Sequence, residues 1–182
     1  MISCAKQSIG MLKKQHEITQ QFEMNERQQK MKHKKALWIP PLLWMGVIFY
    51  FSHQPGKESA QMSGWFSDLL DTIVRFLNLD IPQSDLHLLV RKGAHFTEFA
   101  ILGILLFAAL YPARNKLFPS FIAALIIGAL YGLADELHQY FIPGRSCQIK
   151  DMLIDASGVL FAVLLCCGFI LLKKRFQPGA NS

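Results

Sequence analysis

Four apolar runs, each close to or at the length needed to cross a lipid bilayer, constrain this chain more than any other feature. They cover residues 36–51, 94–111, 118–140 and 151–172. A membrane-spanning helix needs about 17–25 mostly apolar residues. A soluble domain of 182 residues could bury a sizeable core, but it would seldom place its 52% hydrophobic residues in such long runs. We therefore predict an all-α polytopic membrane protein with four transmembrane helices.

The positions of Lys and Arg predict how these helices are oriented, because cytoplasmic loops carry an excess of both residues. Three basic clusters precede the first run, separate the second from the third and follow the fourth: Lys30, Lys32, Lys34 and Lys35; Arg114 and Lys116; and Lys173, Lys174 and Arg175. All three fall on one side of the membrane if both termini are cytoplasmic. This topology accounts for the net charge of +6, so we expect no nucleic-acid partner.

Composition divides the chain into a polar, basic cytoplasmic tail at 1–35, a transmembrane domain at 36–175 and a short C-terminal tail at 176–182. The outer segment between the first two spans contains a further helical pattern. Its apolar side chains recur at helical spacing over residues 65–79, and Asp68, Asp71 and Arg75 occupy the other side. This pattern predicts an amphipathic helix lying at the outer membrane interface.

Polar residues gather at the predicted outer end of each of the three later spans, mostly in stripes along one helix face. They are Lys92, His95 and Glu98 in the second span, Asp135, Glu136, His138 and Gln139 in the third, Arg145 in the following turn, and Asp151 and Asp155 at the start of the fourth. An unpaired charge near the bilayer centre costs about 2.5–3.5 kcal/mol. We therefore expect the acids to pair with Lys92, His95, His138 and Arg145 in an outward-facing polar pocket. Gly128 and Gly132 would let a neighbouring helix approach closely.

We predict neither a metal nor another cofactor from these residues. The spacing of His95, Glu98 and the acids of the later spans matches no established zinc signature. The four cysteines likewise lack the spacing of metal ligands.

Three motifs in this polar layer resemble the VanZ-like family. The first, K-x-x-H-x-x-E-[YF], is matched by Lys92, His95, Glu98 and Phe99. The second, D-E-x-H-Q followed by P-x-R, is matched by Asp135, Glu136, His138, Gln139, Pro143 and Arg145. The third, D-x-x-x-[ND]-x-x-G, is matched by Asp151, Asp155 and Gly158, with Asp155 where Asn is common. The stretch "FSHQPGKES" at 51–59 also contributes, and the resemblance covers about residues 38–172.

This resemblance implies a small multi-pass protein of the bacterial cell membrane. The namesake of the family is an accessory factor that raises tolerance to teicoplanin, so the resemblance also implies a role in the cell envelope. The expected partners are membrane lipids and, as candidate ligands, a lipid-linked cell-wall precursor or a lipoglycopeptide.

Three functions are compatible with the polar layer. The first is a non-enzymatic envelope protein that binds an amphiphile, with Arg145, Lys92 and His95 contacting a phosphate or carboxylate. The second is an intramembrane enzyme that acts on a lipid headgroup by His and carboxylate acid–base or metal chemistry. The third is a proton-coupled transporter, which is disfavoured because the inner halves of the spans are apolar.

Overall fold

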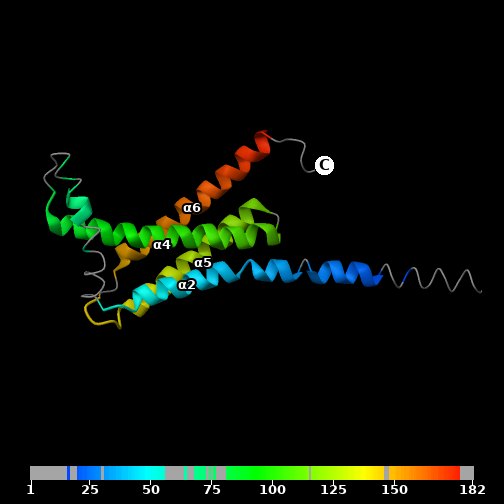
Figure 1. Ribbon diagram of the computed structural model, residues 1–182, viewed down its shortest axis with the longest axis horizontal. Helices are drawn as coiled ribbons and strands as arrows, with labels where there is room; N and C mark the ends of the chain where they lie inside the picture. Colours follow the sequence, from blue (N-terminus) through cyan, green and yellow to red (C-terminus); the bar gives the residue numbers. More distant parts are fainter. Residues whose placement is uncertain are drawn as a thin grey trace, which may run out of the picture. The chain divides into compact units, whose positions relative to one another are not determined.

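The computed structural model describes residues 16, 20–29, 31–55, 64, 68–72, 74, 76, 81–114, 116–145 and 148–176. Its principal helices are α2 (Ile39–Ser52), α4 (Gln83–Arg114), α5 (Leu117–Gln139) and α6 (Ile149–Phe176), which are labelled in Figure 1. The described residues contain no β-strand. The chain divides into two compact units, Met1–Ile39 and Pro40–Ser182. In the first unit, residues 20–29 and 31–36 are helical, and the second unit contains the four-helix arrangement analysed below.

The predicted all-α class and the four spans are confirmed. Four helices of the described chain are long and apolar enough to cross a membrane, namely Gln20–Ser52, Gln83–Ala113, Leu117–Gln139 and Ile149–Phe176. The second begins earlier than its predicted apolar run, since α4 begins at Gln83 and not at residue 94. Its first turns are polar, and a search for apolar runs detects only the later part of the same helix.

The predicted amphipathic helix at 65–79 lies partly outside the described residues, which leave out Trp65, Phe66, Ile73, Arg75 and Leu77. Within that range, residues 68–72, 74 and 76 are helical. Val74 is buried, whereas Phe76 is 84% exposed. The described part is therefore helical and exposes apolar as well as polar side chains.

Helix α4 packs on both α5 and α6, which also pack on each other, and its interface with α6 is the largest of the three. It buries Phe99, Leu102 and Leu106 completely, and α6 buries Val159 and Val163 completely. The apolar core thus lies along these three helices on one side of the layer of buried acids described below.

Glycines allow the helices to approach one another closely. A methyl group on Gly158 of α6 would collide with the backbone carbonyl oxygen of Phe96 in α4. A methyl group on Gly128 of α5 would lie 2.7 Å from a side-chain carbon of Val159. The predicted role of Gly128 and Gly132 is confirmed, since α6 packs directly over both. Such close backbone contact gives van der Waals attraction where lipid removes the hydrophobic driving force between helices.

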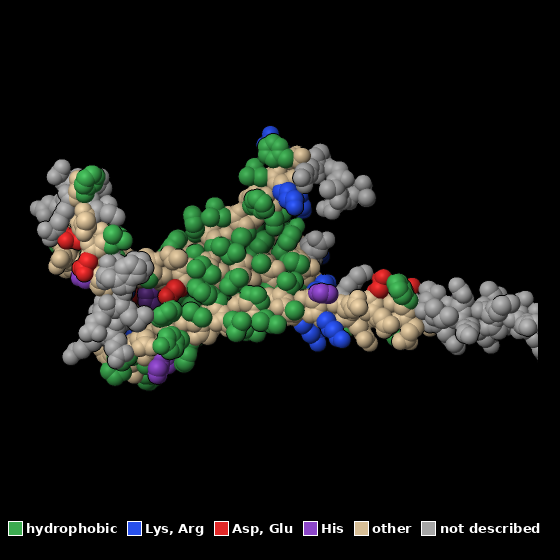
Figure 2. Space-filling model, in the orientation of Figure 1, with side chains coloured by type: hydrophobic (Ala, Val, Ile, Leu, Met, Phe, Trp, Pro, Cys, Tyr) green, Lys and Arg blue, Asp and Glu red, His purple; other side chains and the backbone are tan. Residues whose placement is uncertain are grey.

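The outer surface of the bundle is apolar, as expected of helices that face lipid. Figure 2 shows hydrophobic side chains covering the middle of the visible face of the helices. Leu130 and Leu137 of α5 and Phe161 and Leu164 of α6 are each more than half exposed. A soluble protein would rarely present so extensive an apolar surface to water. The structure and the sequence therefore agree on a multi-pass membrane protein.

Candidate functional site

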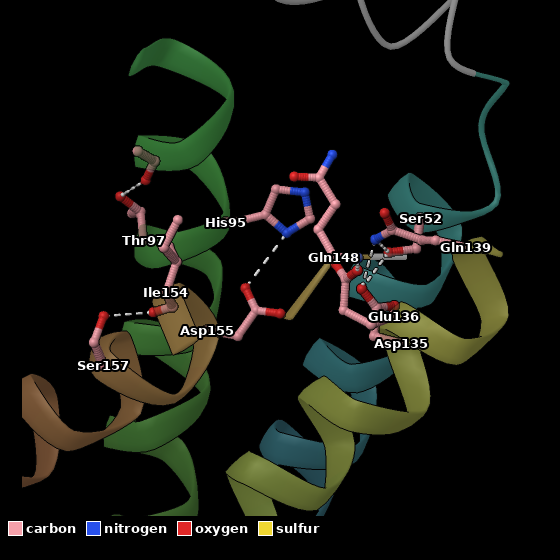
Figure 3. Close-up of polar contacts among 11 residues, drawn as sticks. Ser52, His95, Thr97, Asp135, Glu136, Gln139, Gln148, Ile154, Asp155 and Ser157 are labelled. Atoms are coloured by element: carbon pink, nitrogen blue, oxygen red, sulfur yellow. Dashed lines mark hydrogen bonds and ion pairs between the residues drawn. The ribbon is translucent and has the colours of Figure 1, made fainter. Parts of the chain in front are cut away.

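Six polar side chains meet where α2 and α5 end and α4 and α6 have begun. We call this set the polar cluster; its members are Ser52, His95, Asp135, Glu136, Gln139 and Asp155 (Figure 3). Asp135 is 3% exposed, and Glu136 and Asp155 are 0% exposed. Three buried carboxylates in one layer of a membrane bundle need partners to offset their desolvation.

His95 and Asp155 form the one ion-pair contact among the members of the cluster. His95 Nδ1 lies 3.5 Å from Asp155 Oδ1, and the two side chains are 12% and 0% exposed. At this separation the contact is too long for a good hydrogen bond. Both atoms therefore remain without a hydrogen-bond partner among the described residues, as does Asp155 Oδ2.

Asp135 is held by a hydrogen-bonded triad that connects α5 to the end of α2. Asp135 Oδ2 accepts from Ser52 Oγ at 2.7 Å and from Gln139 Nε2 at 2.9 Å. Gln139 Nε2 also donates to Ser52 Oγ at 3.1 Å. The other carboxylate oxygen of Asp135, Oδ1, has no hydrogen-bond partner within the described chain. The triad therefore fixes one oxygen of Asp135 and leaves the second available.

Glu136, like Asp135, has one carboxylate oxygen that accepts a hydrogen bond and one that does not, and its partner lies next to the start of α6. Its Oε2 accepts from the backbone N–H of Gln148 at 3.1 Å. Its Oε1 is buried, and the described residues supply no hydrogen-bond partner for it.

A small cavity of about 40 Å³ opens beside the cluster, between the beginnings of α4 and α6. It is lined by Leu88, Arg91, Lys92, His95, Gln148, Asp151 and Ile154. This volume admits about three water molecules. His95 belongs both to the cavity wall and to the polar cluster, so it links the buried acids to the space outside. The pocket was expected between the three later spans, whereas the described lining of this cavity comes from α4, α6 and the residue before α6, and not from α5.

Arg145 does not pair with the acids as the sequence led us to expect. Its Nε donates to the carbonyl oxygen of Gln54 at 2.9 Å, and its Nη2 donates to that of Phe51 at 2.9 Å. The preceding turn aims the side chain at α2, since Gly144 has φ 78° and the Arg145 N–H bonds to the Ile142 carbonyl oxygen. Burial lowers the pKa of Arg145, and the nearby Arg91 charge lowers it further, but an arginine keeps its charge in proteins.

His138 also lies apart from the polar cluster. Its Nε2 is 3.3 Å from His53 Nδ1 in an exposed contact, and its ring centroid is 4.6 Å from that of Phe49. Glu98 stays near the cluster and interacts electrostatically with His95, Asp135 and Asp155. The backbone carbonyl oxygen of Glu98 accepts a hydrogen bond from Trp44 Nε1 at 2.9 Å.

The predicted site residues therefore separate into four groups. His95, Asp135, Glu136, Gln139 and Asp155 belong to the cluster, and Glu98 lies near it. Lys92 and Asp151 line the cavity, as does His95. Arg145 and His138 contact the end of α2. Sequence reasoning assigned no role to Ser52, although a serine directly after an apolar run at a helix end was a usable signal.

The model of the VanZ/LLP1 family matches residues 37–172. The chain belongs to this family. The matched region contains α2, α4 and α5 completely, most of α6, and every member of the polar cluster. No curated protein and no solved structure matches the chain.

Membership of the VanZ/LLP1 family thus confirms the resemblance inferred from the three motifs. In this VanZ/LLP1 protein, each motif supplies residues to the cluster from a different helix: His95 from α4, Asp135, Glu136 and Gln139 from α5, and Asp155 from α6. The spacing within each motif sets its helix face, and the packing of α4, α5 and α6 brings the faces together.

Proposed function

We propose that this protein acts in the bacterial cell envelope by binding the anionic headgroup of an amphiphile at the cavity between α4 and α6. We further propose that this binding raises tolerance to glycopeptide antibiotics such as teicoplanin. Family membership and the membrane-spanning helices support the setting, and the cavity supports the choice of ligand.

The observation that carries the proposal is the pair of cations in the cavity wall. Arg91 and Lys92 are partly exposed there, and within the described chain neither forms an ion pair with an acid. Arginine binds phosphate or carboxylate through two parallel hydrogen bonds, and lysine acts as a point charge. The apolar side chains of Leu88 and Ile154 border the same cavity, which suits a ligand with a charged head and an apolar tail. Since the cavity is small, the headgroup would fill it and extend over its mouth.

The ligand could be a lipid-linked cell-wall precursor, which has phosphate groups, or a lipoglycopeptide, which has a carboxylate. Both present an anion together with a long apolar chain. Binding of purified full-length protein in neutral-lipid nanodiscs to a polyprenyl diphosphate, to teicoplanin and to a neutral polyprenol would separate the two sources. We expect Lys92→Gln to weaken binding of the true ligand at least about tenfold, since a hydrogen bond to a charged group contributes about 1.5–3 kcal/mol.

Lys173→Gln is the matched control, because Lys173 is an exposed lysine in the last turn of α6. Its variant should bind as the wild type does. Teicoplanin susceptibility of cells that express each variant at equal membrane abundance gives the biological readout. Equal binding of anionic and neutral amphiphiles by the wild type would refute the ligand class. Loss of teicoplanin tolerance in Lys173→Gln but not in Lys92→Gln would refute the site.

A second candidate function is an intramembrane enzyme that acts on the same headgroup. It is favoured by the contact of His95 with the buried Asp155, because a carboxylate behind a histidine can orient the ring for general acid–base catalysis. Release of inorganic phosphate from a polyprenyl diphosphate by the wild type, and its loss in His95→Gln, would support catalysis. Stoichiometric binding with no product formed would contradict catalysis and support only the binding function.

A further inference from the structure

We propose that His95, Asp135 and Asp155 together bind a divalent transition-metal ion of the Zn²⁺ or Mn²⁺ type. Each residue comes from a different helix, α4, α5 or α6, and each offers one ligand atom. These three atoms all lie within 4.8 Å of one another. The sequence led us to expect these residues in one polar pocket, but no metal was predicted there because their spacing matches no zinc signature. The approach of the three ligand atoms depends on the packing of three helices and not on spacing within one.

The first supporting observation is the set of buried oxygens that lack partners. Both carboxylate oxygens of Asp155 and the Oδ1 of Asp135 accept no hydrogen bond from any described residue. Asp155 is 0% exposed and Asp135 is 3% exposed. Buried carboxylate oxygens are normally hydrogen-bonded, and unsatisfied ones call for an explanation such as a bound ion.

The second observation is the spacing of the ligand atoms. Two ligands at about 2.0–2.2 Å from one tetrahedral metal ion lie about 3.4 Å apart. His95 Nδ1 and Asp155 Oδ1 are separated by 3.5 Å, which is long for a hydrogen bond but matches two ligands of one ion. Side-chain adjustments of about 1 Å would bring the most distant of the three atoms into the same coordination sphere.

The third observation is the charge balance of the layer. Asp135, Glu136 and Asp155 are buried together, and Glu98 interacts electrostatically with two of them. Arg145, one of the counter-ions expected from the sequence, donates instead to the backbone carbonyl oxygens of Phe51 and Gln54. A divalent cation would offset this excess of acid, as buried carboxylates without cationic partners require.

The fourth observation is the support behind one ligand. Ser52 and Gln139 both donate to Asp135 Oδ2 and so orient the carboxylate with Oδ1 free. Hydrogen bonds of this kind to the non-coordinating side of a ligand are a regular feature of metal sites. One imidazole with two carboxylates favours Zn²⁺, Mn²⁺ or Fe²⁺ over Mg²⁺ and Ca²⁺, which prefer oxygen ligands alone.

Three protein ligands would leave at least one position of the ion for water or another ligand. His95 also lines the cavity, so this position is reached from the side on which Arg91 and Lys92 lie. If the proposed headgroup binding is correct, the ion would add positive charge at the base of that cavity. Metal binding itself does not depend on that function and is measured without any amphiphile.

The test uses the full-length protein, purified in detergent with an affinity tag free of histidine. Elemental analysis of the wild type should find about one zinc or manganese ion per chain. After the metal is removed, titration with Co²⁺ followed by its visible absorption should restore one tight site. Asp155→Asn and His95→Gln keep the approximate size of each side chain and should weaken Co²⁺ binding at least about tenfold. Asp85→Asn is the matched control, because Asp85 is an exposed aspartate of α4 outside the cluster.

Several results would overturn the proposal. One is a wild type that binds no more Co²⁺ than Asp155→Asn when both proteins are monodisperse and unfold at the same temperature. In that case the three side chains would be a purely structural cluster. If the variants do not fold, X-ray absorption of the zinc-loaded wild type decides the question. Nitrogen and oxygen ligands including an imidazole support the site, whereas sulfur ligands would assign the metal to the cysteines.

Discussion

At the scale of single residues, the tightest constraint lies at Gly158. Its α-carbon faces the backbone of α4, and any side chain would meet the Phe96 carbonyl oxygen and the Ala100 nitrogen. Backbone atoms cannot move aside as a flexible side chain can. The same contact positions Asp155, one turn earlier on α6, beside His95.

We predict that Gly158→Ala destabilises the bundle by about 1–3 kcal/mol, the usual cost of overpacking. Gly168→Ala on the same helix is the control, since a methyl group there has nothing within 4 Å. Thermal unfolding in detergent measures the difference. Equal melting temperatures for Gly158→Ala and Gly168→Ala would show that α6 does not pack on α4 at this point.

At the scale of elements, α2 is attached to the bundle by hydrogen bonds distributed along its length. Tyr131 donates to the carbonyl oxygen of Met45 at 2.6 Å, and Trp44 donates to that of Glu98 at 2.9 Å. Ser52 and the two bonds of Arg145 complete the attachment at the end of the helix. In lipid, hydrogen bonds and close packing take over the role that the hydrophobic effect has in water.

Arg145 should therefore act on the position of α2. We predict that Arg145→Ala destabilises the bundle by about 1.5–3 kcal/mol, the range for hydrogen bonds that involve a charged group. Arg145→Lys should fall in between, because lysine has no planar fork to reach two carbonyl oxygens. Arg175→Ala, which removes an exposed arginine at the end of α6, serves as control. Chemical unfolding followed by tryptophan fluorescence is suitable, since Trp44 lies on α2.

If Arg145→Ala were as stable as Arg175→Ala and lost only amphiphile binding, Arg145 would have to contact the ligand, as first expected from the sequence. The two roles are thus distinguished by which property the substitution changes.

At the scale of the whole molecule, the sequence predicted the class and the number of spans because these depend on length and hydropathy alone. It also predicted the polar faces of α5 and α6, since Gly128, Gly132 and Asp135 recur at helical spacing in α5, as do Asp155 and Gly158 in α6. The partners of these faces were harder to predict. Arg145 was expected among the acids but bonds to the end of α2, and Ser52 was missed. The helical periodicity of a sequence shows which side chains share a face, but it does not show how two helices align against each other.

The orientation of the whole chain follows from its basic clusters and stays a prediction. In a variant with all four native cysteines replaced by serine, we expect Pro143→Cys to react with a membrane-impermeant maleimide in intact cells. Lys173→Cys should react only after the cells are permeabilised, because the basic end of α6 should face the cytoplasm. The opposite labelling pattern would invert the topology and place the polar cluster on the cytoplasmic side.

The attachment of α2 also determines the order in which the protein can be assembled during its synthesis. Ser52 precedes its partner Asp135 by 83 residues, and Gln54 precedes Arg145 by 91 residues. At about 5–20 residues per second, the ribosome completes these partners about 4–18 s after α2 has been made. During that interval α4 can accompany α2 through the bond of Trp44 to the Glu98 carbonyl oxygen, but the attachment at the end of α2 must wait and is completed late in biogenesis.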